Sequence, residues 1–301
     1  MTLQELRFAI SLAQEKHFGR ASRACFVSQP TLSIAIRKLE KELGVALFER
    51  DNNNVRVTPL GKEIVERAKR VLAEAEGLKQ VAEFDKDQLL GTLKLGVIYT
   101  IGPYLLPPLI TMLNKLAPQM PIEIQEDYTA NLREKLSVGD VDAIIISLPF
   151  SETGVLTRNL YKEPFVVLMP IDHPLTQKKT VNQNELSDYN ILMLGEGHCF
   201  RDQVVSSCPT CFTVPKSQGW RSIAGSSLET IRHMVASNMG ITILPATAAA
   251  SGPYQGTLLT TRPLKAASPN RVVALAWRKS FPRVKAIELL LDAVEKCNLS
   301  K

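Results

Sequence analysis

The stretch ASRACFVSQPTLS, residues 21–33, decides the fold of the amino-terminal region. Ser28 is a preferred N-cap residue, and Pro30 stands in the first turn of the helix that follows, where its missing N–H costs little. Ala21 and Ala24 are small enough to let a short preceding helix cross this helix closely. The stretch therefore predicts two crossed helices joined by a tight turn, a helix-turn-helix.

The second of these helices carries polar side chains on the face opposite its apolar residues. Gln29, Ser33 and Arg37 recur every four residues on this face, and Thr31 lies near the start of the helix. Such side chains at the start of a second helix are typical of proteins that read the major groove of DNA. The polar face of an ordinary surface helix remains the alternative when these residues are considered alone.

A longer pattern around this helix resembles the signature of the LysR family of transcriptional regulators. The matching residues are Ala21-x-x-Ala24-x-x-Val27-Ser28-Gln29-Pro30-Thr31-Leu32-Ser33, then Ile36, Leu39-Glu40, Leu43-Gly44, Leu47-Phe48-x-Arg50 and Val57-Thr58-x-x-Gly61. The resemblance implies a winged helix-turn-helix that binds double-stranded promoter DNA, with RNA polymerase as a partner. It assigns the DNA contacts to Ser28, Gln29, Pro30, Thr31, Ser33 and Arg37 in the recognition helix and to Arg50 in the wing. The tip of the wing, residues 51–54, departs from the basic residues of many members and suits a tight turn.

Residues 59–89 predict a long helix that ends in a polar hinge and follows a DNA-binding domain of residues 1–58. Its apolar residues have a 4-3 spacing, as in the seam of a coiled coil: Ile64, Ala68, Val71, Ala75, Leu78 and Ala82. We therefore expect this linker helix to join two copies of the chain into a dimer, and the family resemblance implies a homotetramer. A helix that packs on its own domain is the alternative.

Residues 90–301 predict an α/β domain, because strand-like apolar runs alternate with helical patterns. The runs are 92–97, 122–127, 143–148, 165–169, 191–194, 241–244 and 272–277, with helices at 227–239 and 283–297. Two crossings between strands would join lobe I, residues 90–163 and 267–301, to lobe II, residues 164–266. The resemblance implies a two-lobed regulatory domain of the periplasmic-binding-protein type. The fold class is therefore α/β, with a winged helix-turn-helix and a long linker helix before the two lobes.

A second stretch carries the reactive chemistry, Gly197-His198-Cys199-Phe200-Arg201-Asp202-Gln203, followed by Cys208-Pro209-Thr210-Cys211. Positive charge from His198 or Arg201 beside Cys199 favours the thiolate, which is the nucleophilic form of the side chain. Cys208 and Cys211 are placed to resolve an oxidised Cys199 as a disulfide. Two alternatives remain open from these residues alone: a zinc site, and cysteines buried as small apolar residues.

Further residues narrow the resemblance to the OxyR-type hydrogen-peroxide sensors within the LysR family. They are Gly102-Pro103-Tyr104-Leu105-Leu106-Pro107, the stretch from Leu192 to Gln203, Cys208, Ser227-Leu228-Glu229-Thr230-x-Arg232 and Gly240-Ile241-Thr242-x-Leu244-Pro245. The resemblance implies that Cys199 is the peroxidatic thiol and Cys208 the resolving thiol. It also implies a peroxide-binding set, to which we assign Thr100, Thr129, His198, Arg201 and Asp202. Cys211 departs from the family and offers an alternative resolving thiol.

The spacing of the two thiols predicts a conformational change. If residues 200–207 are helical, a rise of 1.5 Å per residue sets Cys199 and Cys208 roughly 13 Å apart. A disulfide requires Cα atoms within about 7 Å, so closing this bridge would unwind the segment. Reduction by a thioredoxin or glutaredoxin system would reset it. We therefore expect an activator of oxidative-stress genes whose DNA contacts change when the bridge closes.

Composition sets the outer limits of this interpretation. The 301 residues, 45% of them apolar, suffice for two or three domains, and the net charge of +6 suits an anionic partner. No apolar run approaches the ~20 residues of a membrane span, and no signal peptide is visible. We therefore expect a cytoplasmic protein without a membrane partner, and no metal or cofactor is predicted.

Besides a zinc-regulated binding module, two rival functions remain open. The nearer is a LysR-type regulator that answers a small organic ligand in the cleft between the lobes, with incidental cysteines. The other is a thiol-disulfide or peroxidase enzyme, because Cys208 and Cys211 have the spacing of an oxidoreductase motif. No thioredoxin-like βαβ unit precedes that motif, so we do not expect an enzyme.

Overall fold

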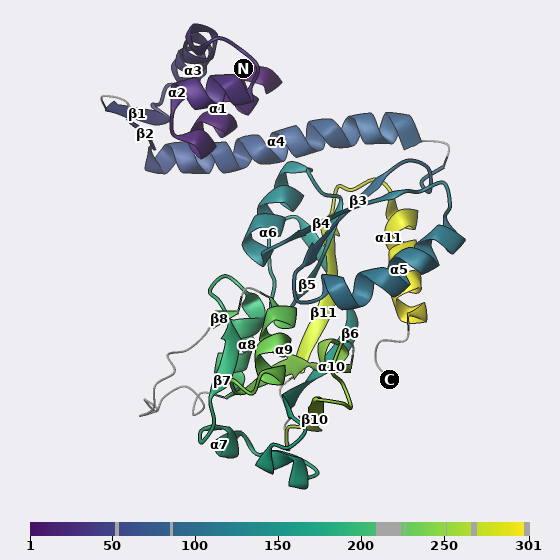
Figure 1. The fold of residues 1–301 in the computed structure, drawn as a ribbon. Helices are drawn as coiled ribbons and strands as arrows, with labels where there is room; N and C mark the ends of the chain where they lie inside the picture. Colours follow the sequence, from purple (N-terminus) through teal and green to yellow (C-terminus); the bar gives the residue numbers. More distant parts are fainter. Residues whose placement is uncertain are drawn as a thin grey trace. The chain divides into compact units, whose positions relative to one another are not determined.

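The structure is a computed structural model of the chain, and it describes residues 1–51, 54–84, 87–208, 224–225, 227–250, 252–265 and 270–297 (Figure 1). The chain divides into two compact units, Met1–Lys86 with Ser137–Asp140, and Asp87–Leu136 with Val141–Lys301. The first unit holds the predicted helix-turn-helix and the linker helix. The second holds the predicted α/β domain, so the predicted fold class is confirmed.

The first unit is a winged helix-turn-helix followed by a long helix. Its elements are α1 (Leu3–Glu15), α2 (Phe18–Ala24), α3 (Gln29–Leu43), β1 (Phe48–Asp51), β2 (Asn54–Val57) and α4 (Pro59–Phe84). Ser28 caps α3 as predicted, since its hydroxyl accepts a hydrogen bond from the N–H of Thr31. Asp51 pairs with Asn54 across the wing, and residues 52–53 lie outside the described residues.

The apolar residues predicted to form a seam along the linker helix α4 do not all have the same surroundings. Val65 and Ala68 are buried in the core of the helix-turn-helix, and Ile64 packs against that core. Further along, Val71 is 44% exposed and Leu78 is 74% exposed. The first part of the seam thus packs on its own unit, as the alternative reading expected, because these side chains complete the core under α1. Only the later part remains available to another copy of the chain.

The second unit is built on one large mixed sheet. Its strands are β3 (Leu93–Ile98), β4 (Ile122–Asp127), β5 (Ala143–Ser147), β6 (Val155–Pro170), β7 (Ile191–Leu194), β8 (Ala224–Gly225), β9 (Ile241–Pro245), β10 (Leu259–Pro263) and β11 (Asn270–Arg278). The strand order is β4-β3-β5-β11-β6-β9-β7-β8, with β10 paired to β6. Its helices are α5 (Gly102–Leu116), α6 (Thr129–Val138), η1 (Pro174–Gln177), α7 (Gln183–Leu186), α8 (Cys199–Ser207), α9 (Leu228–Ala236), α10 (Ala246–Ala250) and α11 (Val284–Lys296).

The long strand β6 runs through both lobes of this unit (Figure 1). Residues 155–164 pair with β11, and residues 165–170 pair with β9 and β10. One apolar core gathers around β3, β5 and β11, and a separate one gathers around β7 and β9. The lobe boundaries drawn from the sequence stay a prediction.

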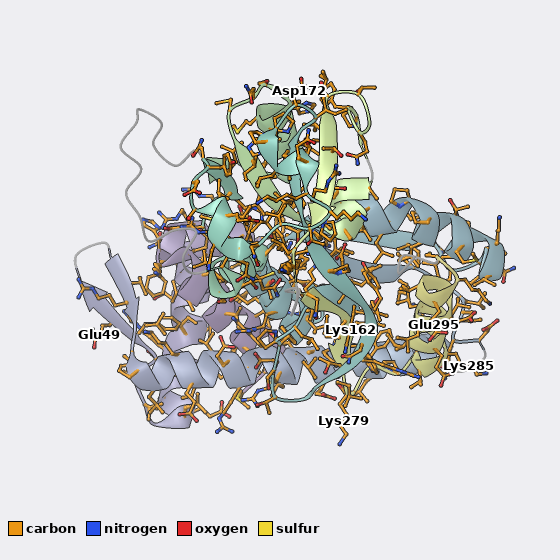
Figure 2. The ribbon with its side chains drawn as sticks, turned by 90° about the horizontal axis from the view of Figure 1, so that it is seen from below. Glu49, Lys162, Asp172, Lys279, Lys285 and Glu295 are labelled. Carbon is orange, nitrogen blue, oxygen red and sulfur yellow. The ribbon has the colours of Figure 1, made fainter. Side chains whose placement is uncertain are left out.

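Most sequence-predicted strands match within two residues, but the first part of β6 was missed. Residues before Phe165 do not form an apolar run; Lys162 is exposed, whereas the neighbouring Glu163 is buried. Lys162 is labelled in Figure 2. Successive side chains of a strand point to opposite faces, and here the buried position holds a charged residue, so apolarity alone gave no signal. Of the described helices, none is long and apolar enough to cross a membrane.

Candidate functional site

The site begins at the ends of two neighbouring parallel strands, β3 and β4, which stop at the same edge of the sheet. Tyr99 and Thr100 follow β3, and Tyr128 and Thr129 follow β4. The parallel register brings the two strand ends together, and the Tyr99 and Tyr128 rings there contact each other. Thr100 is buried, and the hydroxyl oxygen of Thr129 is buried with no hydrogen-bond partner among the described residues.

The start of α8 completes a small pocket above these strand ends. His198 is the N-cap residue of α8, and Cys199 is its first residue. The pocket is lined by Ile98, Tyr99, Thr100, Asp127, Tyr128, Thr129, Gly197, His198 and Cys199. The structure thus brings together four of the predicted site residues, Cys199, His198, Thr100 and Thr129, from three segments that are distant in the sequence. Their role in binding peroxide stays a prediction.

The other two predicted contacts lie elsewhere. Arg201 lines a separate cavity against the core around β7 and β9. Asp202 is exposed in the first turn of α8, where a negative charge interacts favourably with the amino end of the helix. Successive helical residues point in different directions, so residues that adjoin Cys199 in sequence do not all share its pocket.

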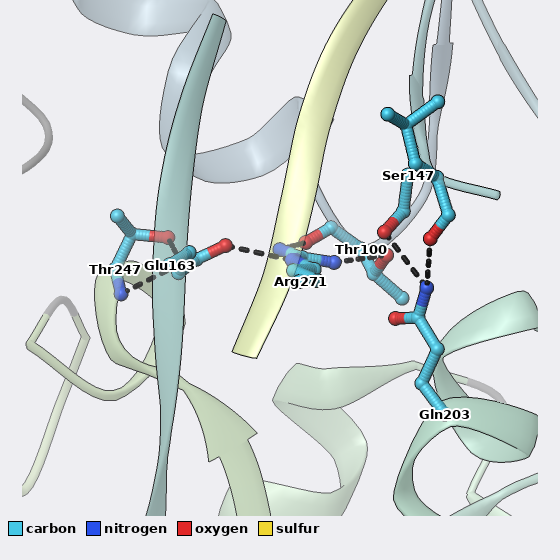
Figure 3. A network of polar contacts seen from close by, with 7 residues as sticks. Thr100, Ser147, Glu163, Gln203, Thr247 and Arg271 are labelled. Atoms are coloured by element: carbon cyan, nitrogen blue, oxygen red, sulfur yellow. Dashed lines mark hydrogen bonds and ion pairs between the residues drawn. The ribbon is translucent and has the colours of Figure 1, made fainter. Parts of the chain in front are cut away.

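A buried ion pair is joined to the end of β3 through Thr100 (Figure 3). Arg271 of β11 stands directly opposite Glu163 of β6, and its Nε donates to the Glu163 carboxylate at 2.7 Å. Its two terminal nitrogens donate to the hydroxyl and to the carbonyl oxygen of Thr100, each at 2.9 Å. Thr247, at the start of α10, donates its N–H and its hydroxyl to the same carboxylate. The network therefore holds Thr100 to Arg271 and links it, through Glu163, to the start of α10. Sequence reasoning missed it, because no local pattern links residues so far apart.

Helix α8 is attached to both lobes in a different way. Phe200 and Val204 point into the core of lobe II, where the Phe200 ring meets the Phe165 ring edge to face at 5.1 Å. Gln203, on another side, donates through Nε2 to the Ser147 hydroxyl at 2.8 Å and to the Leu148 carbonyl at 3.0 Å (Figure 3). This single side chain tethers the helix to the end of β5.

A second polar contact joins the lobes. The Tyr104 hydroxyl of α5 donates to the Glu229 carboxylate of α9 at 2.7 Å, and burial raises the pKa of Tyr104. Glu229 in turn accepts from the guanidinium of Arg232, which is fully buried. These groups come from two of the motifs that carry the resemblance to the OxyR-type sensors, but only the fold brings them together.

The four cysteines in the described part of the chain differ in redox state. Cys199 is a free, half-buried thiol, and Cys25 and Cys297 are also free. Cys208 follows the last residue of α8, is 1% exposed, and is disulfide-bonded. The predicted alternative thiol Cys211 lies outside the described residues. The helical state that the sequence argument assumed for residues 200–207 is present, so a helical rise of ~13 Å separates the two expected partners.

Aromatic rings surround the thiol pocket. The ring centroids of Tyr128 and His198 lie 4.8 Å apart, those of Tyr99 and Tyr128 lie 5.3 Å apart, and those of Tyr99 and His198 lie 6.1 Å apart, all edge to face. Burial raises the pKa of Tyr99, with the nearby Asp127 charge adding to the shift. Sequence reasoning missed both tyrosines, although each directly precedes a predicted threonine.

Asp127 closes the pocket at the end of β4. Its carboxylate accepts hydrogen bonds from Lys135 at 2.9 Å, from the Asn131 amide at 2.7 Å and from the N–H of Tyr128 at 2.8 Å. Burial alone would raise the pKa of Asp127, but these hydrogen bonds together outweigh burial and lower it. The group is therefore held ionised at the rim of the pocket.

The candidate DNA surface is the outer face of α3. Among the predicted contacts, five are exposed and Ser33 is half-buried: Ser28, Gln29, Pro30, Thr31 and Arg37. Arg50 lies in β1, opposite Val55, and its side chain is outside the described part of the chain. Sequence reasoning missed Ile34, which is 66% exposed on the same helix. An apolar side chain at such a position can contact a thymine methyl group.

Comparison with known proteins places the chain in a family. The model of the bacterial regulatory helix-turn-helix protein, lysR family, matches residues 3–62, and that of the LysR substrate binding domain matches residues 86–298. The Escherichia coli K12 protein named DNA-binding transcriptional dual regulator OxyR is 36% identical over 98% of this chain and 95% of its own length.

Solved structures agree over the same length. A full-length Pseudomonas aeruginosa OxyR carrying C199D is 51% identical, covers 100% of both chains and has a TM-score of 0.77. A hydrogen-peroxide-bound OxyR mutant of Corynebacterium glutamicum is 32% identical over 98% of this chain and 92% of its own, with a TM-score of 0.64. The chain belongs to the LysR family of bacterial helix-turn-helix transcriptional regulators.

Proposed function

We propose that this protein is a DNA-binding transcriptional regulator that senses hydrogen peroxide through Cys199 and activates oxidative-stress genes. One observation carries the proposal: a free Cys199 thiol shares a water-sized pocket with Thr100 and Thr129. Relatives similar over nearly the whole chain are named hydrogen peroxide-inducible genes activators or OxyR. A cysteine in a pocket of this size suits a very small oxidant better than an organic effector.

The geometry supports a two-electron oxidation of Cys199. The thiolate attacks one peroxide oxygen, so that an S–O bond forms, the O–O bond breaks, and hydroxide leaves and takes up a proton to become water. The Thr100 hydroxyl oxygen accepts from Arg271, so its own proton remains available for the peroxide. The Thr129 oxygen has no described partner and can bind the other peroxide oxygen. His198 also lines this pocket, and its ring contacts the Tyr128 ring edge to face.

The second step turns oxidation into movement. The sulfenic acid of Cys199 condenses with a Cys208 thiol, and water leaves. Because the helix separates these residues by ~13 Å and a disulfide spans at most about 7 Å between Cα atoms, α8 must unwind. Unwinding withdraws Gln203 from Ser147 and Leu148 and removes a polar link between the lobes.

The disulfide at Cys208 adds a condition to this cycle. A sulfenic acid condenses with a thiol and not with a disulfide, so Cys208 must first be reduced. A dithiol reductant of the thioredoxin or glutaredoxin type supplies the two electrons and also resets the Cys199–Cys208 bridge. While Cys208 remains disulfide-bonded, oxidation of Cys199 stops at the sulfenic acid. The role of Cys211 as an alternative resolving thiol belongs to the same proposal.

The remaining parts of the proposal concern assembly. The exposed Val71 and Leu78 on α4 offer an apolar surface to the linker helix of a second copy. Dimers so formed associate into tetramers, bind promoter DNA through α3 and act on RNA polymerase in the cytoplasm. The overall charge of +6 favours the DNA partner.

The test is footprinting of promoter DNA by the reduced full-length protein, before and after treatment with hydrogen peroxide. We expect wild type to change its footprint and Cys199→Ser to bind DNA with a footprint that peroxide leaves unchanged. Cys297→Ser removes a free thiol outside the pocket and should behave as wild type. A Cys199→Ser variant that still switched normally would exclude Cys199 as the sensor and favour a small organic ligand.

A further inference from the structure

We infer that Tyr99 and Tyr128, together with His198, form a size-selective wall that admits hydrogen peroxide to Cys199 and excludes alkyl hydroperoxides. The inference rests on the proposed reaction of Cys199 with peroxide and deepens it, since it assigns substrate selectivity to two tyrosines that the proposed reaction does not use and to the ring of His198. We call these three residues the aromatic wall.

The aromatic wall is a single interlocked unit made from three separate segments. Tyr99 comes from the end of β3, Tyr128 from the end of β4 and His198 from the start of α8. Each ring contacts both of the others edge to face, with centroids between 4.8 and 6.1 Å apart. Such contacts favour one defined arrangement of the rings. No ring can therefore swing aside without breaking contacts with two neighbours.

The loop before Cys199 closes the wall on one side. A Cβ atom added at Gly197 would lie 3.3 Å from the Tyr128 ring, which is already a tight contact. Gly197 also has a φ of +93°, a conformation that L side chains rarely adopt. The Tyr128 ring consequently packs against bare backbone beside the thiol, and the space there is filled by the ring.

The pocket inside the wall is very small. The volume open to the centre of a water-sized molecule is about 10 Å³, which is roughly the minimum for a single water. Hydrogen peroxide is only slightly larger than water. An alkyl hydroperoxide presents the same O–O group but must also place several carbon atoms beside it, where the tyrosine rings stand.

Selectivity must come from this fit because the chemistry is the same for both classes. With an alkyl hydroperoxide the Cys199 thiolate also attacks the terminal oxygen, forms the S–O bond and breaks the O–O bond. The alkoxide leaves and takes up a proton to become the alcohol. Neither reaction needs a group that the other lacks, and the intrinsic difference between the two oxidants is the same in every variant, so a change in the ratio of their rate constants reports access to the thiol.

The experiment compares the rate constants of Cys199 oxidation by hydrogen peroxide and by tert-butyl hydroperoxide in the reduced full-length protein. Sulfenic acid is trapped with a dimedone probe and quantified by mass spectrometry. We expect wild type to prefer hydrogen peroxide, and Tyr128→Ala to narrow the ratio of the two rate constants by about tenfold or more, as one misfit group in a pocket does. Tyr99→Ala, which opens the wall independently, should narrow the ratio in the same direction.

Two controls separate a wall from a general defect. Tyr128→Phe keeps the ring and should retain the wild-type ratio, and Tyr189→Ala removes a tyrosine that lies outside this pocket and should leave both rates unchanged. Ratios unchanged in both alanine variants, or a wild type that reacts equally with both oxidants, would overturn the inference. Failure of the wild-type thiol to react with hydrogen peroxide would instead contradict the proposed function.

Discussion

The ends of β3 and β4 and the helix α8 line the same pocket, but they are held in place by different means. The strand ends are fixed by sheet register and by Arg271, whose guanidinium is fully buried and spans Thr100 and Glu163. Helix α8 is held by the apolar side chains on one face and by the Gln203 tether.

This difference matches the two tasks of a redox sensor. The surface that binds the oxidant has to keep its shape from one cycle to the next. In the proposed cycle, the segment that carries the thiol has to refold so that Cys199 can reach Cys208. A buried ion pair resists the loss of either partner strongly, whereas a short helix on a core can exchange its contacts at lower cost.

Breaking the ion pair under the strand ends should have the largest effect. Glu163→Gln leaves Arg271 buried without its counter-charge, so we expect the free energy of unfolding to fall by about 3–5 kcal/mol. Urea denaturation of the full-length protein measures it. The matched control is Glu63→Gln, which breaks the exposed pair with Arg67 and should cost about 0–1 kcal/mol. Equal losses in the two variants would show that the strand ends are no better fixed than the surface.

Loosening the apolar attachment of α8 should have a smaller effect on stability and a larger one on the switch. Val204→Ala shortens a side chain that is 3% exposed, and we expect the free energy of unfolding to fall by about 1–3 kcal/mol. Because the helical state is weakened, the Cys199–Cys208 bridge should close faster after peroxide treatment, as followed by mass spectrometry. Val205→Ala changes a half-buried neighbour on the same helix. If Val204→Ala closed the bridge no faster than wild type and Val205→Ala, helix stability would not limit the rate of the switch.

Removing the Gln203 tether tests the polar attachment of α8 to lobe I. Gln203→Ala deletes the two hydrogen bonds to Ser147 and Leu148. We expect the free energy of unfolding to fall by about 0.5–1.5 kcal/mol and the Cys199–Cys208 bridge to close faster. Ser206→Ala, at an exposed position of the same helix, provides the comparison. If the bridge closed more slowly in Gln203→Ala than in wild type, the tether would guide the unwinding of α8 and would not oppose it.

The smallest effect is expected from a fall in pH, acting on Asp127 at the end of β4. The folded-state pKa of Asp127 lies below its ordinary value, which is about 4. Its contribution to stability is therefore fully present above about pH 4 and is lost as pH falls through the lowered folded-state pKa. The difference in urea midpoint between wild type and Asp127→Asn should shrink on acidification.

Asp172→Asn provides the control for that pH series. Asp172 is exposed at the periphery of the second unit (Figure 2), so this variant should show no comparable trend. If the difference in urea midpoint between wild type and Asp127→Asn grew with falling pH, that result would contradict a lowered folded-state pKa of Asp127.

The sequence predicted those parts of the molecule that local patterns encode. Ser28 and Pro30 predicted where α3 begins, and the runs at 122–127 and 191–194 match β4 and β7. Family motifs then led to Cys199, His198, Thr100 and Thr129, and the fold does bring these four residues together.

The remainder depends on contacts between distant residues. Arg271 and Glu163 meet only because β6 and β11 pair in one register, and neither lies in a pattern that points to the other. Tyr99 and Tyr128 become neighbours through the pairing of β3 with β4. Arg201 and Asp202 show the converse, because adjacency to Cys199 in sequence does not place them in its pocket.

The most direct test of the account combines disulfide mapping with hydrogen exchange in the fully reduced protein after stoichiometric hydrogen peroxide. The account predicts a Cys199–Cys208 bridge, together with a loss of amide protection across residues 200–207 that spares the strands β3 and β4. A bridge that formed while α8 kept its protection would contradict the account. So would a Cys199 that stayed free of any bridge while the DNA footprint changed.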